Sequence, residues 1–566
     1  MCGILGFAGL SLESIHTTNA IACQKHRGPD ATGEKRIDRA YLGHNRLSII
    51  DLSSDANQPM SDDSGRFWLV FNGEIYNYRE LKRALSDYPF RTQSDSEVLL
   101  ASYIKWGDDC LSHLIGMFAF SIWDDREKRL FLARDRFGVK PLHYVSTEGG
   151  LMFASEIRTL HEMGTEKKPD WSTWATYLNA GLTGHLAHTF WSGIQSLPAG
   201  HHLTWQDGTY HITRWYDFEH AVGTETDARS DAEVEEEYLS LLEQSVAFRF
   251  RADVPLGVNL SGGLDSSILM ALIQRVRGIN DDTRAYTFVC GHPDYDELPW
   301  VEAMLAGSHH NLTPCLLRAE DVPTLHQMVS LHQSEPYGGL PTLAYQQIFK
   351  TASDSGCKVL LDGQGMDEQW AGYDYYRHTD LVQAPLIQGT RSKIVNEGCY
   401  QPDFLLQART PNIAKPFSDP LRNLQFRDLF YTKLPRALRF NDRISMMHSV
   451  ELREPFLDHR LVELAFRQPA HRKINELEGK LFLRRIAQHL IPEGVRTAPK
   501  RPLQTPQREW FRGALRDWII AETDRAARRF PEVVHPSFRQ HVDQYLMGHG
   551  DNSFFVWQLL SLAAIA

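Results

Sequence analysis

Residues 260–267 read Leu-Ser-Gly-Gly-Leu-Asp-Ser-Ser, and the fold of the surrounding chain can be worked out from this stretch. The apolar run 254–260 predicts a strand that leads into it, and the apolar run 268–276 predicts a helix that follows. Gly262 and Gly263 lack a Cβ atom, so the backbone can close tightly around an anion. Serine hydroxyls and the free N–H groups of the helix start can donate hydrogen bonds to that anion. The stretch therefore predicts an anion-binding loop between a strand and a helix.

Asp265 lies inside this loop, where a carboxylate conflicts with a bound anion unless a cation separates the two. Mg²⁺ held by phosphates and by Asp265 removes the conflict. The loop lacks the Walker A pattern and resembles the SGGxDS loop of the ATP pyrophosphatases, which cleave ATP between its α and β phosphates and form acyl-adenylates. An ordinary Gly-Ser turn that opens a helix is the alternative. We therefore expect ATP and Mg²⁺ as cofactors, with these ATP-binding residues: Leu260, Ser261, Gly262, Gly263, Asp265, Ser266 and Ser267.

Composition and charge are those of an ordinary soluble protein. The 566 residues are 42% hydrophobic and 23% charged, and they suffice for two or more domains. The net charge of −11 argues against nucleic acid as a partner, and no apolar run is long enough to span a bilayer. The 7 cysteines form no close pairs in the sequence, so we expect no disulfide framework, no zinc site and a cytoplasmic location. Small-molecule substrates are the expected partners, and a homodimer is left open.

The chain begins Met1-Cys2-Gly3-Ile4. Removal of Met1 would leave Cys2 with a free α-amino group, whose usual pKa is close to neutral. A thiol and a base on one residue form a nucleophile that needs no histidine, because the amine can take the thiol proton. Taken alone, a cysteine at the second position is better explained by chance.

Five further segments of the first half accompany Cys2. They are 26–30 (His-Arg-Gly-Pro-Asp), 44–49 (His-Asn-Arg-Leu-Ser-Ile), 72–77 (Asn-Gly-Glu-Ile-Tyr-Asn), 94–97 (Ser-Asp-Ser-Glu) and 133–142 (Ala-Arg-Asp-Arg-Phe-Gly-Val-Lys-Pro-Leu). With Cys2, this set resembles the class II, or N-terminal nucleophile, glutamine amidotransferases over roughly the first 200 residues. The resemblance implies an α+β fold, the α-β-β-α sandwich, with the cysteine as the catalytic nucleophile.

The same resemblance gives other groups a role in hydrolysing the side-chain amide of glutamine. The oxyanion hole is formed by the Asn72 side-chain amide and the Gly73 backbone N–H. Arg46 suits the glutamine carboxylate, because its guanidinium is a planar fork. Asp95, helped by Glu74, suits the ammonium group. The structural alternatives are a surface ion pair for Arg46 and a helix N-cap for Asp95.

Short apolar runs bounded by Gly, Asp or Asn predict a largely antiparallel sheet in this half. Residues 190–218 predict a closing hairpin and an exit strand, and the polar stretch 219–232 predicts a linker. A class II glutamine amidotransferase domain is therefore expected at 1–218. Arg27 and Asp30 are expected to form structural pairs around the turn between them. The expected strands include 67–71, 118–123, 129–133 and 151–154.

The second half alternates predicted helices with predicted strands, which indicates an α/β domain with a parallel sheet covered on both faces. A helix is expected at 233–250, and strands are expected at 285–290 and 358–362. Ligands of such sheets bind at the carboxyl ends of the strands. The turn 363–368, which follows the last of these strands, should therefore lie beside the 260–267 loop.

This turn reads Gly-Gln-Gly-Met-Asp-Glu and supplies further candidates. Asp367 is the expected second carboxylate for Mg²⁺, and a helix-capping aspartate is the alternative. Gly363, Gln364 and Gly365 are the expected additional ATP-binding residues.

Motifs continue through the second half. They are 441–446 (Asn-Asp-Arg-Ile-Ser-Met), 450–458 (Val-Glu-Leu-Arg-Glu-Pro-Phe-Leu-Asp), 478–480 (Glu-Gly-Lys) and Lys500. With the first half and the loop, they make nearly the whole chain resemble glutamine-hydrolysing asparagine synthetase. The resemblance implies that 219–566 is an ATP-binding amidation domain with the adenine nucleotide alpha hydrolase-like fold. It also implies that Lys500 stabilises charge on the adenylate and on the leaving pyrophosphate. A surface lysine in a proline-rich turn is the alternative, and the charged residues of 450–458 are expected to be structural.

Two positions depart from the family pattern. Gln364 stands where the synthetases carry a glutamate, and an amide cannot accept a proton from ammonia at neutral pH. Asp367, Glu368 or Glu335 would then serve, unless no base is needed. The segment 335–342 lacks the family's arginine and has two glycines that suggest room for a larger acceptor.

The expected reaction is glutamine hydrolysis followed by adenylation and amidation of a carboxylic acid, by default aspartate. The resemblance also implies an internal tunnel for ammonia. A sugar uronate or a biosynthetic intermediate is the alternative acceptor. A β-lactam synthetase-like cyclase or a non-catalytic homologue would be expected to lack either Cys2 or the glycine loop.

Overall fold

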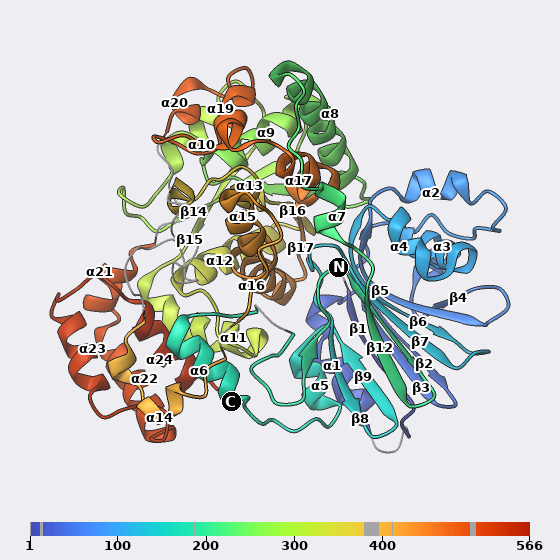
Figure 1. Ribbon diagram of the computed structural model, residues 1–566, viewed down its shortest axis with the longest axis horizontal. Helices are drawn as coiled ribbons and strands as arrows, with labels where there is room; N and C mark the ends of the chain where they lie inside the picture. The colour runs from blue at the N-terminus through green and yellow to red at the C-terminus, as the bar shows by residue number, and fades with distance from the viewer. Residues whose placement is uncertain are drawn as a thin grey trace.

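The computed structural model describes residues 2–11, 15–184, 187–377, 395–409, 411–498 and 505–565. Two six-stranded antiparallel sheets occupy the N-terminal part, and a five-stranded parallel sheet occupies the C-terminal part (Figure 1). Lys500 lies outside the described residues. Within the described ranges, no helix is long and apolar enough to cross a membrane.

The two antiparallel sheets face each other and share one apolar core, to which Ile4 and Leu42 contribute from the first sheet and Val70 and Leu132 from the second. The strand order of the first sheet is β10 (Gln195–Ser196), β8 (His143–Thr147), β9 (Gly150–Ala154), β1 (Gly3–Ala8), β3 (Ala40–Arg46) and β2 (Ala31–Ile37). The order of the second is β12 (Thr209–Arg214), β11 (His201–Gln206), β7 (Arg129–Arg134), β6 (Gly116–Asp124), β5 (Phe67–Ile75) and β4 (Met60–Ser61).

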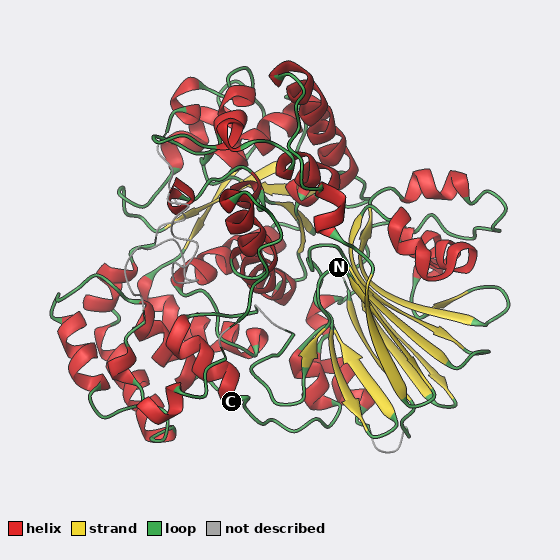
Figure 2. Ribbon diagram, in the orientation of Figure 1, coloured by secondary structure: helices red, strands yellow, loops and turns green. Residues whose placement is uncertain are grey.

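Helices cover the outer faces of both sheets, which confirms the expected α-β-β-α sandwich (Figure 2). The first sheet is covered by α1 (Thr17–Cys23) and α5 (Ile157–Glu162). The second is covered by α3 (Asp95–Trp106), with α2 (Tyr78–Ala84) and α4 (Cys110–His113) beside it. Because each sheet is buried on both sides, its central strands are apolar along almost their whole length. The predicted strands 67–71, 118–123, 129–133 and 151–154 all lie within observed strands.

The parallel sheet also has helices on both faces, as predicted. Its order is β15 (Leu312–Leu316), β14 (Arg284–Val289), β13 (Leu256–Asn259), β16 (Val359–Leu361) and β17 (Glu451–Arg453). Leu360 and Leu452 pack into the core shared with α12 (Leu340–Asp354) and α16 (Lys433–Met447). Val359 and Leu361 pack on the other side against α8 (Asp231–Arg249) and α9 (Leu264–Arg277). This alternation follows from the two-residue period of a strand.

Besides the linker, helix packing and hydrogen bonds connect the N-terminal and C-terminal halves of the chain. In the N-terminal half, α6 (Trp171–Ala180) packs against C-terminal helices, and Gln558 Nε2 donates a hydrogen bond of 2.6 Å to Tyr177 O. The C-terminal group comprises α14 (Pro402–Leu405), α21 (Gln507–Arg512), α22 (Arg516–Arg529), α23 (Phe538–Leu546) and α24 (Phe554–Ala563). The other helices are α7 (Phe218–Val222), α10 (Leu298–Leu305), α11 (Val322–Gln333), α13 (Met366–Gln369), α15 (Pro420–Phe430), α17 (His459–Phe466), α18 (Ala470–Lys473), α19 (Leu481–Ala487) and α20 (Glu493–Arg496).

The topology of the parallel sheet places the two segments that were predicted to bind ATP side by side. β13 and β16 are parallel neighbours, so the 260–267 loop and the 363–368 turn leave the sheet at the same edge. All seven cysteines are free thiols in this structure.

Candidate active sites

Cys2 lies at the start of β1, beside the side chain of Asn72 from β5. The Cys2 backbone N–H donates to Asn72 Oδ1 at 3.0 Å. The other end of the amide, Asn72 Nδ2, is buried and has no hydrogen-bond partner among the residues that the structure describes. A buried amide donor without a partner is costly in a folded protein. Asn72 is therefore fixed at one end and holds an unused donor at the other, which is the arrangement that an oxyanion hole requires.

Gly73 follows in the same strand and permits a close approach of two backbones. Its φ is +152°, and a Cβ atom built on it would lie 2.1 Å from Met117 O. Any other residue would displace β6, so glycine at this position is enforced by packing.

Asp95 is the first residue of α3, but it does not cap the helix. Ser94 is the N-cap, and its hydroxyl accepts from Ser96 N–H at 3.1 Å. Asp95 Oδ2 instead accepts from Ile75 N–H at 2.9 Å, next to the Asn72–Gly73 pair in β5. Burial raises the pKa of the Asp95 carboxyl to about 6. The capping alternative for Asp95 is therefore wrong.

Glu74 reaches the parallel sheet of the other half. Its carboxylate lies 3.2 Å from Arg453 Nη2, and both side chains are buried. Arg453 Nε also donates to Glu451 at 2.6 Å, and its Nη1 donates to the backbone of Arg249 at 2.6 Å. Sequence reasoning treated Arg453 as structural and did not foresee that it pairs with a predicted glutamine-binding residue.

Arg46 ends β3 and is almost fully buried. Its Nη1 donates to Ser53 O at 2.6 Å and to Asn57 Oδ1 at 2.8 Å, while its Nη2 bonds to the carbonyls of Ile50 and Asp51. Both terminal nitrogens are thus used to hold the loop 50–57. A glutamine carboxylate would have to replace some of these bonds, so the binding role of Arg46 stays a prediction. The surface ion pair considered for Arg46 is wrong.

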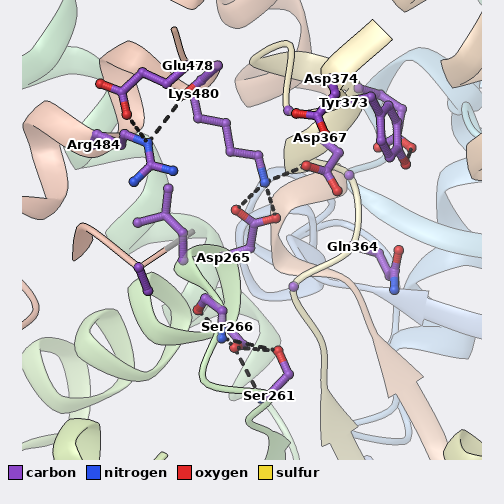
Figure 3. Close-up of a pocket in the computed structure, with 18 of the residues that line it drawn as sticks. Ser261, Asp265, Ser266, Gln364, Asp367, Tyr373, Asp374, Glu478, Lys480 and Arg484 are labelled. Atoms are coloured by element: carbon purple, nitrogen blue, oxygen red, sulfur yellow. Dashed lines mark hydrogen bonds and ion pairs between the residues drawn. The ribbon is translucent and has the colours of Figure 1, made fainter. Parts of the chain in front are cut away.

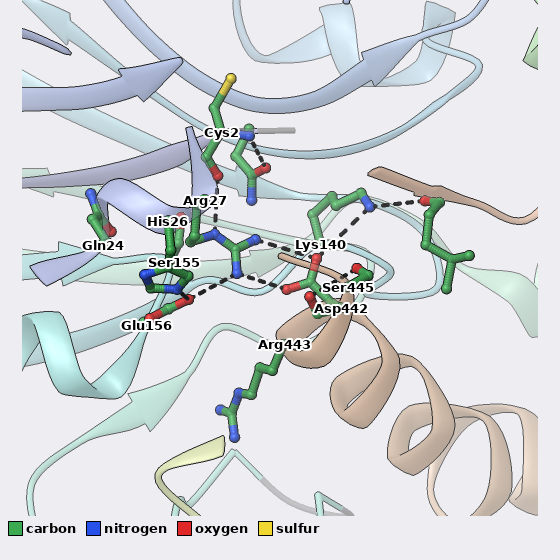
Figure 4. Close-up of polar contacts among 12 residues, drawn as sticks. Cys2, Gln24, His26, Arg27, Lys140, Ser155, Glu156, Asp442, Arg443 and Ser445 are labelled. Atoms are coloured by element: carbon green, nitrogen blue, oxygen red, sulfur yellow. Dashed lines mark hydrogen bonds and ion pairs between the residues drawn. The ribbon is translucent and has the colours of Figure 1, made fainter. Parts of the chain in front are cut away.

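Arg27 forms different contacts from those that the sequence predicted, and Figure 4 shows it between Cys2, Glu156 and Asp442. It was expected to pair with Asp30, but Asp30 pairs with Lys358 at 2.8 Å. The Arg27 guanidinium is fully buried, and its Nε donates to Cys2 O at 3.1 Å. Its Nη1 contacts Glu156 at 3.1 Å and Asp442 of α16 at 3.0 Å. One side chain therefore links the backbone of Cys2 to α16 in the C-terminal half of the chain.

The second candidate site is a cavity of about 820 Å³ at the carboxyl edge of the parallel sheet (Figure 3). It is lined by the loop residues 261–266 and by the turn residues 363–365, 367 and 368. Ser266 Oγ bonds to Ser261 Oγ at 3.1 Å and to Gly263 O at 3.2 Å, and these bonds fix the loop. α9 begins at Leu264, within this loop, and its first turn lies at the cavity wall, where the positive end of the helix dipole favours an anion.

Lys480 lies between the two predicted metal carboxylates, which sequence reasoning missed. Its Nζ is 2.7 and 2.6 Å from the two carboxylate oxygens of Asp265 and 2.6 Å from Asp367 Oδ1. Gly372 passes so close that a Cβ there would lie 2.3 Å from Lys480 Cε. Two carboxylates that share one cation can also hold Mg²⁺ with phosphate oxygens, so the donor set fits that metal.

Two predicted ATP-binding residues do not line this cavity. Leu260 is fully buried, and its backbone N–H bonds to Tyr286 O at 2.9 Å in the neighbouring strand. Ser267 is also fully buried, because it lies on the inner face of α9. Residues 261–266 line the cavity, whereas Leu260 and Ser267, at the two ends of the stretch, belong to the core.

Gln364 stands where the family pattern has a glutamate, and the structure shows its surroundings and those of the residues considered as alternative bases. Gln364 lines the cavity, and its Nε2 is 3.5 Å from Tyr345 Oη. Of the proposed alternative bases, Glu335 lies outside the cavity, paired with Arg439 at 3.2 Å and Arg443 at 2.8 Å. Glu368 lines the cavity, and burial raises its pKa to about 7.

The two glycines of segment 335–342 do not enlarge the cavity. A Cβ on Gly338 would meet Thr342 Oγ1 at 3.0 Å, and one on Gly339 would meet Gln507 Oε1 at 3.2 Å. Leu340 is fully buried in the core. The space beside these glycines is filled by protein, so the expectation that they create room for a larger acceptor is wrong.

Comparison with known proteins identifies two domains in the chain. Residues 1–216 match the model of the glutamine amidotransferase domain, and residues 237–566 match that of asparagine synthase. The chain belongs to the asparagine synthase family. It is accordingly an ATP-using amide ligase that takes its nitrogen from glutamine, acting on small-molecule substrates.

Similar proteins include bacterial and fungal relatives. A Mycobacterium tuberculosis (strain H37Rv) protein named "Putative asparagine synthetase (glutamine-hydrolyzing)" is 31% identical over 99% of this chain and 96% of that protein. Asparagine synthetase (glutamine-hydrolyzing) 1 of Bacillus subtilis (strain 168) is 28% identical over 94% of this chain and 90% of its own length. A Gibberella zeae protein named Amidase chry2 is 27% identical over 87% of this chain and 85% of that protein.

Proposed function

We propose that Cys2 is the glutaminase nucleophile. Once Met1 is removed, the Cys2 amine takes the proton of the thiol, and the thiolate attacks the side-chain amide carbon of glutamine. Asn72 Nδ2 and the Gly73 N–H stabilise the oxyanion, Asp95 and Glu74 bind the substrate ammonium, and Arg46 binds its carboxylate. Ammonia leaves, and water hydrolyses the thioester. The unused Asn72 donor beside Cys2 is the observation that best supports this part.

The synthetase reaction is proposed for the 820 Å³ cavity. The loop 261–266 and the turn 363–365 bind ATP, and the acid carboxylate attacks its α-phosphorus to form an acyl-adenylate and pyrophosphate. Asp265 and Asp367 would hold Mg²⁺, which neutralises phosphate charge when bound. Ammonia then displaces AMP to give the amide, and Lys500 is proposed to stabilise the leaving pyrophosphate. We assign these two activities to domains 1–218 and 219–566.

Aspartate is the default acceptor, because the bacterial relatives that cover nearly the whole chain are named asparagine synthetases. A different carboxylic acid is the second candidate. Gln364 and the absence of the expected arginine from 335–342 favour it, and so do fungal relatives that are named amidases.

Pyrophosphate release tests the proposal. The purified chain is incubated with Mg-ATP and ammonia, with and without aspartate, and the product is analysed by mass. Aspartate-stimulated release with formation of asparagine would establish the default acceptor. Release that needs another acid would establish the second candidate, and no release with any acid would refute the proposed synthetase activity.

Cys2→Ala is the matched control for the glutaminase half. This variant should lose glutamine-dependent amidation and keep ammonia-dependent amidation. Loss of both activities in a folded Cys2→Ala protein would contradict the division of labour between the two sites.

A further inference from the structure

Two buried carboxylates lie side by side at the carboxyl edge of the parallel sheet. β16 and β17 are parallel neighbours, and the Asp362 N–H continues their ladder by donating to Arg453 O at 3.0 Å. Asp362 and Glu454, which directly follow the two strands, therefore lie next to each other. Because side chains alternate along a strand, both carboxylates are on the face of Leu360 and Leu452, which packs against α12 and α16.

Neither carboxylate has an ion-pair partner within the part of the chain that the structure describes, although Asp362 is only 4% exposed and Glu454 only 3%. Both carboxylate oxygens of Glu454 also lack a hydrogen-bond partner there. Asp362 accepts from neutral groups, the Gly363 N–H at 2.6 Å and Asn259 Nδ2 at 3.5 Å. Buried carboxylates without a cation lower the stability of a fold, and such groups are enriched at functional sites.

Tyr345 of α12 connects this pair to Gln364. It lines the cavity together with Asp362 and Gln364, and its Oη lies 3.5 Å from Gln364 Nε2. Burial and the charges of Asp362 and Glu454 raise the pKa of its hydroxyl, so the phenol is close to both carboxylates. The carboxylate that position 364 lacks is therefore present in the same part of the cavity.

This part of the sheet edge also contacts the N-terminal half of the chain, where Lys140 Nζ donates to Leu452 O at 3.3 Å. Burial raises the pKa of Asp362 to about 6, and burial and the charge of Asp362 raise the pKa of Glu454 well above its usual value. Asp362 is thus more basic than an ordinary aspartate. The other charged groups that act on the pair are Asp265 of α9, Arg249 of α8 and Lys140.

We propose that Asp362 is the base that accepts a proton from ammonia during amide formation. The ammonia nitrogen attacks the carbonyl carbon of the acyl-adenylate and forms the C–N bond. The nitrogen, which is now positively charged, gives one proton to the Asp362 carboxylate. The bond between the carbonyl carbon and the phosphate oxygen then breaks, and AMP leaves with the electron pair.

Glu454 is a positioning residue in this scheme. A proton on Asp362 relieves the repulsion between the two carboxylates, so Glu454 makes its neighbour a better proton acceptor. The base of the reaction is thereby moved from position 364 to position 362. This inference rests on the proposed function, because it takes the cavity to be the site of amide synthesis.

Single-turnover kinetics separate the step that Asp362 serves from the step before it. The full chain is mixed with Mg-ATP and the acid that drives pyrophosphate release in the test above. Pyrophosphate formed without ammonia reports adenylation, and amide formed with ammonia reports the second step. Asp362→Asn should slow amide formation about 10²–10⁴-fold, the usual contribution of a general base, and should leave adenylation within about threefold of the wild type.

Hydroxylamine in place of ammonia gives a readout that a structural role would not change. Hydroxylamine is the weaker base, so its adduct loses a proton to water more readily. Hydroxamate formation in Asp362→Asn should therefore fall at least about tenfold less than amide formation. Glu454→Gln should slow amide formation about 3–10-fold, again more than hydroxamate formation. Gln364→Glu, added to Asp362→Asn, should restore amide formation at least about tenfold, because a carboxylate returns to this part of the cavity.

Asp354→Asn is the matched control. It makes the same change at an exposed position at the end of α12, where Asp354 pairs with Lys350 at 2.5 Å, and it should leave both steps unchanged. Three results would overturn the inference: amide formation within threefold of the wild type in Asp362→Asn, equal losses with ammonia and hydroxylamine, or an equal loss of adenylation that Gln364→Glu does not repair. A loss of amide formation in Glu368→Gln but not in Asp362→Asn would also overturn it and assign the role to Glu368.

The wild-type chain separates this inference from the proposed function. If it forms amide and the variants behave in one of the contrary ways, the proposed function stands and the assignment of Asp362 fails. If it forms no pyrophosphate with any acid, the proposed synthetase activity is refuted, and the role of Asp362 is refuted with it.

Discussion

Replacing Arg27 with methionine should damage the glutaminase far more than the synthetase. Methionine keeps an unbranched side chain of similar length but removes every charged contact. The backbone carbonyl of Cys2 then loses its 3.1 Å hydrogen bond, and Glu156 and Asp442 lose their shared cation. Because Arg27 lines no part of the nucleotide cavity, ammonia-dependent pyrophosphate release should stay within about threefold of the wild type in folded protein.

The expected loss of stability follows from burial. The side chains of Arg27 and Asp442 are 0% and 4% exposed, and removing one partner of such a pair costs about 3–5 kcal/mol. For a domain of about 200 residues, 1 kcal/mol corresponds to about 2–4 °C in Tm, so Arg27→Met should melt roughly 6–20 °C lower. Lys140 Nζ, at 3.9 Å from Asp442, leaves that carboxylate partly compensated, which favours the lower end of the range.

A double-mutant cycle with Asp442→Asn provides the decisive assay. The double variant should be more stable than the sum of the two single losses predicts, with a coupling of about 1–3 kcal/mol. Thermal unfolding and both activities are measured for all four proteins. Strictly additive losses, or equal loss of glutamine-dependent and ammonia-dependent activity in Arg27→Met, would refute the reasoning.

Three further predictions concern single residues. Asn72→Ala should lower kcat with glutamine about 10²–10³-fold, because an oxyanion donor is lost, and should spare ammonia-dependent release. The pKa of Asp95, about 6, predicts that kcat/KM for glutamine falls as the pH drops through 6 and the carboxylate becomes protonated; Asp95→Asn should lose this limb of the profile. Lys480→Met should lower the Tm measured without nucleotide by about 5–10 °C, because two carboxylates lose their cation, and added Mg²⁺ should restore part of it. Equal losses with glutamine and ammonia, a pH limb retained in Asp95→Asn, or an unchanged Tm would contradict the respective argument.

Local patterns predicted the elements on which the sites are built. The glycine-serine loop at 260–267 predicted its strand and helix, because tight turns and hydrophobic periodicity act over a few residues. Parallel topology then predicted that the 363–368 turn lies beside this loop, and β13 and β16 are indeed neighbours. Even here the pattern could not decide which loop residues face the core, as Leu260 and Ser267 show.

Contacts between distant residues could not be predicted in the same way. Arg27 and Asp442 are separated by 415 positions, and Lys480 and Asp265 by 215. The residues next to Arg27 or Lys480 in the sequence do not identify the distant partner, because a charged residue in a short motif is as compatible with an exposed turn as with a buried ion pair. Lys433 shows the same limit: without the fold, nothing places it at the wall of the cavity.

The pair formed by Glu74 and Arg453 has a consequence for how such enzymes can be recombined. A glutaminase half grafted onto the synthetase half of a relative would bury Glu74 against whatever residue replaces Arg453, and a mismatch would leave a charge without a counterion. The two halves must therefore change together at such positions. Because buried charges pair across their boundary, the two halves are not freely exchangeable modules.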